Sequence, residues 1–213
     1  HADDLTIVWS DCGEQILVDA GRFAYGKNLP VDSPLREHGF FYEAKERQYV
    51  ESTVAHNTIE LDGRIHDRRR KPYGVLPLEA GQDGDAYILV GRAEHDGWSQ
   101  ERILTMVPHT SLQVFDVIQV EDGGTHEAIS WFNLNGEFEL ASASGSELVF
   151  DMRNGKFLRA SADVSNADGT EASLVGPVRG QADPLRGWRS VKDREMIPCW
   201  SFGFRFSVRG QAD

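Results

Sequence analysis

Short runs in which apolar and polar residues alternate recur along the whole chain. The clearest run lies near the C-terminus, where every second residue is apolar and small or polar residues separate Phe202, Phe204, Phe206 and Val208. Successive side chains of a β-strand point to opposite faces, so this period of two predicts a strand with one buried face.

Further segments have the composition of strands and are separated by turn residues. They cover residues 5–10, 15–19, 53–62, 86–94, 99–107, 112–121, 127–134, 138–141, 147–153 and 156–162. Turn signals about every 8–12 positions are typical of a sandwich or barrel. We therefore predict one all-β domain over residues 1–213, built as an antiparallel multi-layer β-sandwich. Only residues 42–50 suggest a helix, of two turns.

Composition narrows the function. Apolar residues make up 40% and charged residues 26%, which favours a globular chain over a disordered one. The formal net charge of -12 argues against nucleic acid as a partner, because phosphate would be repelled. No apolar run is long enough to span a membrane. Cys12 and Cys199 could pair or could be two buried thiols.

Three polar residues fall at corresponding positions of the first three predicted strands. His1 precedes the first strand, Asp19 closes the second, and His56 lies in the third, on the same predicted face as Thr58. Two imidazoles and one carboxylate are a common ligand set for zinc. Unrelated polar residues at strand ends would give the same pattern, and no HExxH or CxxC motif decides between the two interpretations.

Two further features could contribute to a site. Tyr49 lies close to His56 in the sequence and could donate or accept a proton, although most tyrosines are packing residues. Residues 64–71 contain five Arg or Lys against one Asp, and Arg68, Arg69 and Arg70 are consecutive. Arginine binds carboxylates and sulfates through two parallel hydrogen bonds, whereas a basic run is more often only a solvated loop.

Several strings in the first 63 residues resemble one family. The order and spacing of His1-Ala2-Asp3, residues 17–21 (Leu-Val-Asp-Ala-Gly), Tyr49, residues 52–58 (Ser-Thr-Val-Ala-His-Asn-Thr) and Asp62-Gly63 are similar to those of the β-sandwich domain of heparinase II/III-like polysaccharide lyases. Oligoalginate lyases and heparan- or heparin-degrading lyases share this arrangement. The rest of the chain matches only as a run of strands.

The resemblance implies a metal and a missing partner domain. Members of the family have an α/α toroid before the β domain, and an Asn, a His and a Tyr of the toroid do most of the chemistry. The family motif reads His-x-His-Ala-Asp, and its second histidine, a zinc ligand, corresponds to His1. Asp19 and His56 correspond to the other two ligands. The zinc would be structural, and the chain would be the β half of a larger lyase.

The activity implied is β-elimination on an anionic, uronate-containing polysaccharide, in the periplasm or outside the cell. Tyr49, His56 and the basic run would form the edge that meets the glycan. The alternative is a non-catalytic carbohydrate-binding or structural module of the same ancestry. The sequence does not choose between alginate and a glycosaminoglycan.

Overall fold

The computed structural model describes residues 1–68, 74–164 and 171–210, and most of these residues lie in antiparallel strands. Within the described residues, the helical elements are α1 (Lys45–Val50) and two single 3-10 turns, η1 (Pro34–Arg36) and η2 (Thr53–Ala55). The predicted all-β fold is confirmed, and α1 falls inside the segment that suggested a helix. No described helix has the length and apolar character needed to cross a bilayer.

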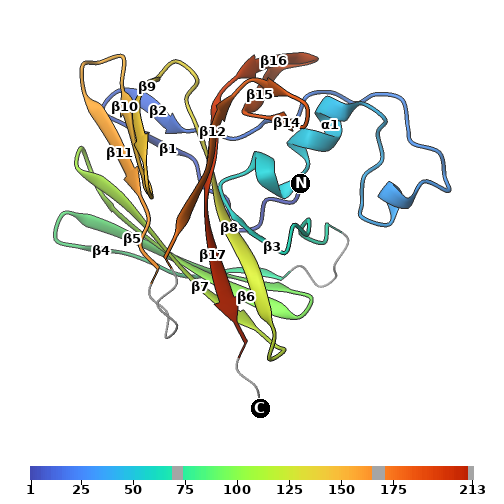
Figure 1. Cartoon of the computed structure of the whole chain (residues 1–213), viewed down its shortest axis with the longest axis horizontal. Helices are drawn as coiled ribbons and strands as arrows, with labels where there is room; N and C mark the ends of the chain where they lie inside the picture. Colours follow the sequence, from blue (N-terminus) through green and yellow to red (C-terminus); the bar gives the residue numbers. More distant parts are fainter. Residues whose placement is uncertain (69–73, 165–170, 211–213) are drawn as a thin grey trace.

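A six-stranded sheet forms the centre of the molecule (Figure 1). Its strands run in the order β1-β2-β8-β17-β12, and β3 also pairs with β8. Their bounds are β1 (Trp9–Asp11), β2 (Glu14–Leu17), β3 (Ile59–Leu61), β8 (Thr125–Leu134), β12 (Ser173–Arg179) and β17 (Trp200–Arg209). The long pair β8–β17 runs from Trp200 opposite Leu134 to Arg209 opposite Thr125.

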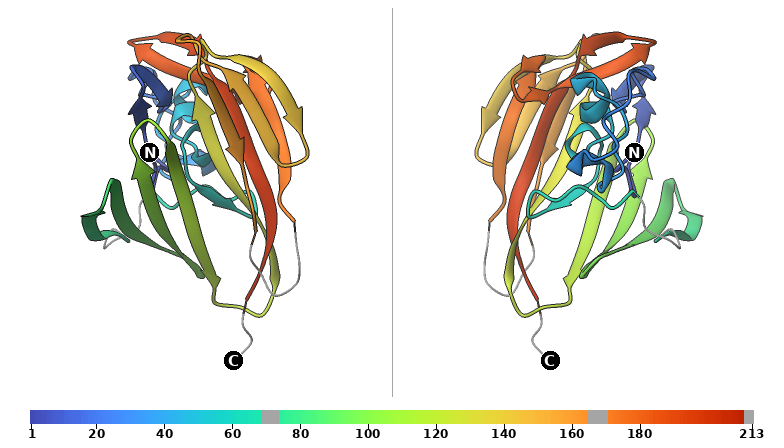
Figure 2. Two further views of the ribbon diagram at one scale, coloured as in Figure 1. Left: turned by 90° about the vertical axis from the view of Figure 1, so that its left-hand side faces the viewer. Right: turned by 90° about the vertical axis from the view of Figure 1, so that its right-hand side faces the viewer.

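Two smaller sheets and two short hairpins complete the fold. The four-stranded sheet contains β4 (Val75–Asp83), β5 (Ala86–His95), β6 (Trp98–Val107) and β7 (Ser111–Val120). The three-stranded sheet contains β9 (Glu139–Ser144), β10 (Glu147–Asp151) and β11 (Phe157–Ser161). The hairpins are β13 (Gln181–Ala182) with β14 (Leu185–Arg186), and β15 (Trp188–Lys192) with β16 (Glu195–Pro198). Figure 2 shows the sheets as separate layers.

One face of β17 packs against both smaller sheets. Phe202 and Phe204 belong to the apolar cluster shared with Phe150 of the three-stranded sheet. Phe206 and Val208 pack against the cluster that contains Trp98 of the four-stranded sheet. The period of two in the sequence therefore marked the strand face on which the two cores meet.

The predicted strands differ from the observed ones mainly near the N-terminus. The first predicted strand, 5–10, is shortened to β1, and Leu5 has a positive φ of 55°. The predicted strand 53–62 begins as the turn η2, in which the His56 N–H donates to the Thr53 carbonyl oxygen at 3.0 Å. His56 therefore precedes β3 rather than lying within a strand. Cys12 and Cys199 are both free thiols.

A buried ion pair joins the four-stranded sheet to the N-terminal third of the chain. Arg102 of β6 is 2% exposed, and its Nε and Nη2 donate to the two carboxylate oxygens of Asp116 at 2.7 and 2.8 Å. Its Nη1 donates to the carbonyl oxygens of Leu5 at 2.8 Å and Asn57 at 2.5 Å. One guanidinium thus holds both the N-terminal segment at Leu5 and the residue after His56 against the four-stranded sheet.

We expect Arg102→Met to lower the free energy of unfolding by about 3–5 kcal/mol, because it leaves the buried carboxylate of Asp116 without its cation. The matched control is Arg92→Met on β5, which removes an exposed ion pair with Glu94 and should lower stability far less. Urea unfolding of both variants measures the difference. Equal losses would contradict the central role of Arg102.

Candidate metal and anion-binding site

His56 is held rigidly where η2 meets β3. Its backbone is extended, with φ of -119° and ψ of 166°, and its side chain is fully buried. The next residue, Asn57, is also fully buried, and its Nδ2 donates to the carbonyl oxygen of Val18 at 2.9 Å. This contact brings the end of β2, and with it Asp19, next to the imidazole.

Asp19 contacts His56 directly. Its Oδ2 lies 2.8 Å from His56 Nδ1, and its Oδ1 accepts the Gly21 N–H at 2.8 Å. Burial alone would raise the pKa of the Asp19 carboxyl, but the hydrogen bonds from His56 and Gly21 outweigh it and leave that pKa below its ordinary value. Asp19 is therefore ionised at neutral pH and available to a cation.

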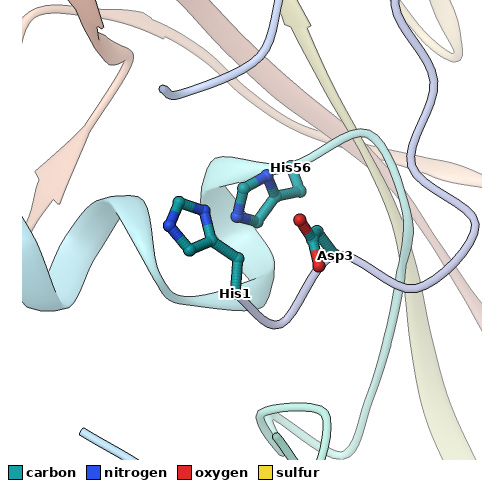
Figure 3. Close-up of side chains that lie close together, drawn as sticks. All are labelled: His1, Asp3 and His56. Carbon is teal, nitrogen blue, oxygen red and sulfur yellow. The ribbon is translucent and has the colours of Figure 1, made fainter. Parts of the chain in front are cut away.

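His1 and Asp3 approach the same imidazole from the N-terminal segment (Figure 3). The possible ligand atoms of His1, Asp3 and His56 all lie within 4.8 Å of one another, and the two imidazole centroids are 5.4 Å apart. His56 Nε2 is buried and has no hydrogen-bond partner among the described residues. A buried, unpartnered imidazole nitrogen beside a carboxylate fits a zinc site.

The structure thus brings two of the predicted ligands, His1 and Asp19, next to the third, His56, and adds Asp3 as a fourth candidate. Asp19 contacts His56 but is not part of the compact group that His1, Asp3 and His56 form. Asp3 was within the string that carries the family resemblance, yet nothing in the sequence distinguished it as a ligand.

A pocket of about 590 Å³ opens beside this group. It is lined by His1, Asp3, Asp19, Gly21, Arg22, Arg47 and Arg68. Three arginines and two aspartates therefore line the pocket. The chain as a whole has a net charge of -12, so the pocket is less acidic than the rest of the molecule. Sequence reasoning missed Arg22 and Arg47.

Two of these arginines share one buried carboxylate. Arg47 Nη2 and Arg68 Nη2 lie 2.7 and 2.8 Å from Glu51 Oε1, and the Glu51 side chain is 2% exposed. With Glu51 included, three arginines and three carboxylates (Asp3, Asp19 and Glu51) surround the pocket, so its charge is close to balanced whereas the whole chain is acidic. The Nε and Nη1 atoms of Arg68 are buried and have no hydrogen-bond partner within the described residues. The guanidinium groups of the arginines that line the pocket are the donors that bind carboxylates and sulfates.

The other predicted site residues are Tyr49, Arg69 and Arg70. Arg69 and Arg70 fall outside the described residues. Tyr49 does not line the pocket; it is buried in an apolar cluster with Val50 and Ala55, and its hydroxyl oxygen accepts the Trp188 N–H at 3.3 Å. Burial raises the pKa of Tyr49 above its ordinary value, and its hydroxyl packs away from the pocket. Its catalytic role stays a prediction.

A family model described as heparinase II/III-like, C-terminal, matches residues 1–192. The chain belongs to this family. The heparinase II/III-like domain also resembles solved structures. The heparan sulfate lyase HepC mutant from Pedobacter heparinus has a TM-score of 0.71 and 16% identity, covering 100% of this chain and 31% of that chain. The heparinase III-BT4657 gene product with methylated lysines has a TM-score of 0.69 and 14% identity, covering 100% of this chain and 28% of that chain.

At these identities the two structures establish the fold alone. The heparinase II/III-like domain spans less than a third of the length of either of them. A comparison with curated proteins finds no match.

Gly21 allows the Asp19 turn to lie against the β15–β16 hairpin, and this contact generates a prediction. Its φ is +72°, and an added Cβ would lie 2.2 Å from the Ser190 carbonyl oxygen. Gly21→Ala should therefore lower stability by about 1–3 kcal/mol more than the cost of the positive φ alone.

Gly13→Ala is the matched control, because Gly13 has a φ of +80° and an added Cβ would meet nothing within 4 Å. It should cost about 1–2 kcal/mol. Thermal unfolding of the two variants isolates the cost of the contact with Ser190. Equal losses of stability would show that the β15–β16 hairpin moves aside without cost.

Proposed function

We propose that this domain is part of a polysaccharide lyase that cleaves uronate-containing anionic glycans by β-elimination. The observation that carries the proposal is the arginine-lined pocket beside His1 and His56 in an otherwise acidic chain. Family membership supports it, as does the fold shared with a protein titled heparan sulfate lyase.

The reaction sets three demands. The proton at C5 of a uronate is α to a carboxylate, and its removal adds negative charge to a group that is already an anion. An enzyme must neutralise that carboxylate, supply a base at C5 and protonate the leaving glycosidic oxygen. A pair of catalytic carboxylates, as in glycoside hydrolases, would repel the substrate acid.

This chain would meet the first demand. Arg68 and Arg22, which both line the pocket, are proposed to bind the sugar carboxylate or a sulfate. Glu51 holds Arg47 and Arg68 in place, so the wall is preorganised. Arg69 and Arg70 are proposed as further sources of positive charge. The base and the acid are proposed to come from an upstream α/α toroid.

Zinc is proposed as the cofactor of the site. His1, Asp19 and His56 are the proposed ligands. Because Asp19 contacts Nδ1 of His56, an ion at the open Nε2 would take its carboxylate from Asp3, and Asp19 would then orient the imidazole. When bound, zinc would supply a fixed positive charge beside the pocket and a link between three chain segments, which is a structural role. The location proposed for the enzyme is the periplasm or the cell exterior, where such polysaccharides are encountered.

A non-catalytic carbohydrate-binding module is the second candidate. It is favoured by Tyr49, the one predicted catalytic residue of this chain, which is buried away from the pocket. Such a module would use the same arginines to bind an anionic glycan without cleaving it.

His56→Ala should lower zinc affinity by at least about 10-fold, because it removes the buried imidazole on which the other candidates converge. His38→Ala, at an exposed loop position, is the control and should leave affinity unchanged. Zinc titration against a competing chelator measures both variants. Unchanged zinc affinity in folded His56→Ala would rule out this site.

Arg68→Met in the full-length protein should lower kcat/KM on the preferred glycan by about 100-fold, through the loss of carboxylate neutralisation. Arg159→Met, at an exposed position on β11, is the control and should change it little. The assay follows ultraviolet absorbance of the unsaturated uronate product from alginate, heparan sulfate, heparin and hyaluronan oligomers.

The two candidate functions give different results in this assay. Binding to an anionic glycan without any unsaturated product would favour the binding module and overturn the lyase. Cleavage that is indifferent to Arg68→Met would keep the lyase and remove the proposed carboxylate contact.

A further inference from the structure

A second group of ligand-type side chains lies between the N-terminal segment and the four-stranded sheet. The possible ligand atoms of Asp4, His66 and His95 lie within 4.8 Å of one another. They come from three separate places: the N-terminal segment, the loop after β3, and the last residue of β5. Neither the predicted metal site nor the arginine pocket includes them.

The tautomer of His66 is fixed by the backbone. Its Nε2 lies 2.7 Å from the Ile59 carbonyl oxygen and must donate the hydrogen, because a carbonyl can only accept. Nδ1 therefore carries the lone pair. That atom is buried, with the residue 4% exposed, and has no hydrogen-bond partner within the described part of the chain. A carbonyl that orients an imidazole while its other nitrogen stays open is typical of a metal ligand.

The spacing of the three groups suits a shared ion better than direct contact. Asp4 Oδ2 lies 3.6 Å from His66 Nδ1 and 3.8 Å from His95 Nδ1, which is beyond normal hydrogen-bond length. Ligands on one tetrahedral zinc, with bonds of about 2.0–2.2 Å, are about 3.3–3.6 Å apart. The two distances from Asp4 are therefore within a few tenths of an ångström of those expected around one ion.

The surroundings hold the ligands in place. The ring of His95 stacks on Trp98, with centroids 3.9 Å apart and planes 13° apart, and the ring of His66 lies 4.5 Å from that of His95. The Asp4 carbonyl oxygen accepts the Thr58 hydroxyl at 2.5 Å.

We propose that Asp4, His66 and His95 form a second metal centre, for zinc or a similar divalent transition metal. Two imidazoles and a carboxylate are the donors such ions prefer, and three protein ligands leave one position for water. The Asp4 side chain is 31% exposed, which gives the ion a route from solvent. The bound ion would link the N-terminal segment to the end of β5.

The test counts metal ions in the purified protein with and without each site. A third group, formed by Asp11, Cys12 and His109, is more exposed, so every protein in the test carries Cys12→Ser to weaken it. After treatment with a chelator, the proteins are titrated with Co²⁺, whose visible absorption reports tetrahedral coordination, and with Zn²⁺ in a calorimeter.

We expect two ions per chain in the Cys12→Ser protein and one in the His56→Ala variant. Adding Asp4→Asn to the His56→Ala variant should weaken the remaining ion at least about 10-fold, because the amide cannot supply a charged ligand. His95→Gln should have the same effect. His126→Ala is the control, and the ion should stay.

Circular dichroism confirms that each variant is folded before it is titrated. Asp4→Asn is nearly isosteric, so it tests the site even where a histidine substitution unfolds the chain. If the proposed site at His56 bound no metal, the Cys12→Ser protein would bind one ion, and Asp4→Asn alone would remove it. The second centre is overturned if His56→Ala binds no ion, or if folded Asp4→Asn binds its remaining ion as tightly as its parent.

Discussion

The buried amide of Asn57 joins chain segments that are far apart in the sequence. Its Nδ2 donates to the carbonyl oxygens of Ile7 at 2.6 Å and Val18 at 2.9 Å, and its Oδ1 accepts the Asn133 N–H at 2.6 Å. Its own carbonyl oxygen accepts from Arg102. A buried polar group left without its partner costs about 1–3 kcal/mol, so the loss of any one of these contacts would destabilise the fold. They also fix the direction of the neighbouring histidine.

Strands could be predicted where their two faces differ in hydrophobicity. The alternation at Phe202 to Val208 was visible because small or polar residues separate the apolar ones, and from Arg205 onward those residues are also exposed. β4 gave no such signal, since all nine of its residues are exposed. The hairpins β13–β14 and β15–β16 are too short for a pattern to develop. Their position depends on contacts such as the one between Gly21 and Ser190, which are remote in sequence.

The candidate site could be predicted only in part. The spacing of His1, Asp19 and His56 suggested a metal, and the family resemblance strengthened that interpretation, but the pocket depends on tertiary contacts. Arg47 looked like an ordinary helix residue. The one available signal was its i,i+4 spacing from Glu51, which is common on exposed helices. The burial that gives this pair its meaning comes from packing that the sequence does not display.

The adjacent aspartates of the N-terminal segment point to a linkage between the two ligand groups. Asp3 belongs to the group around His56, and Asp4 belongs to the group around His66. Insertion or deletion of one residue just after Asp4 would shift both carboxylates by one position and take each away from its histidines. The two groups therefore share one alignment of the chain. In evolution they would tend to be kept or lost together, and neither could drift along this segment alone.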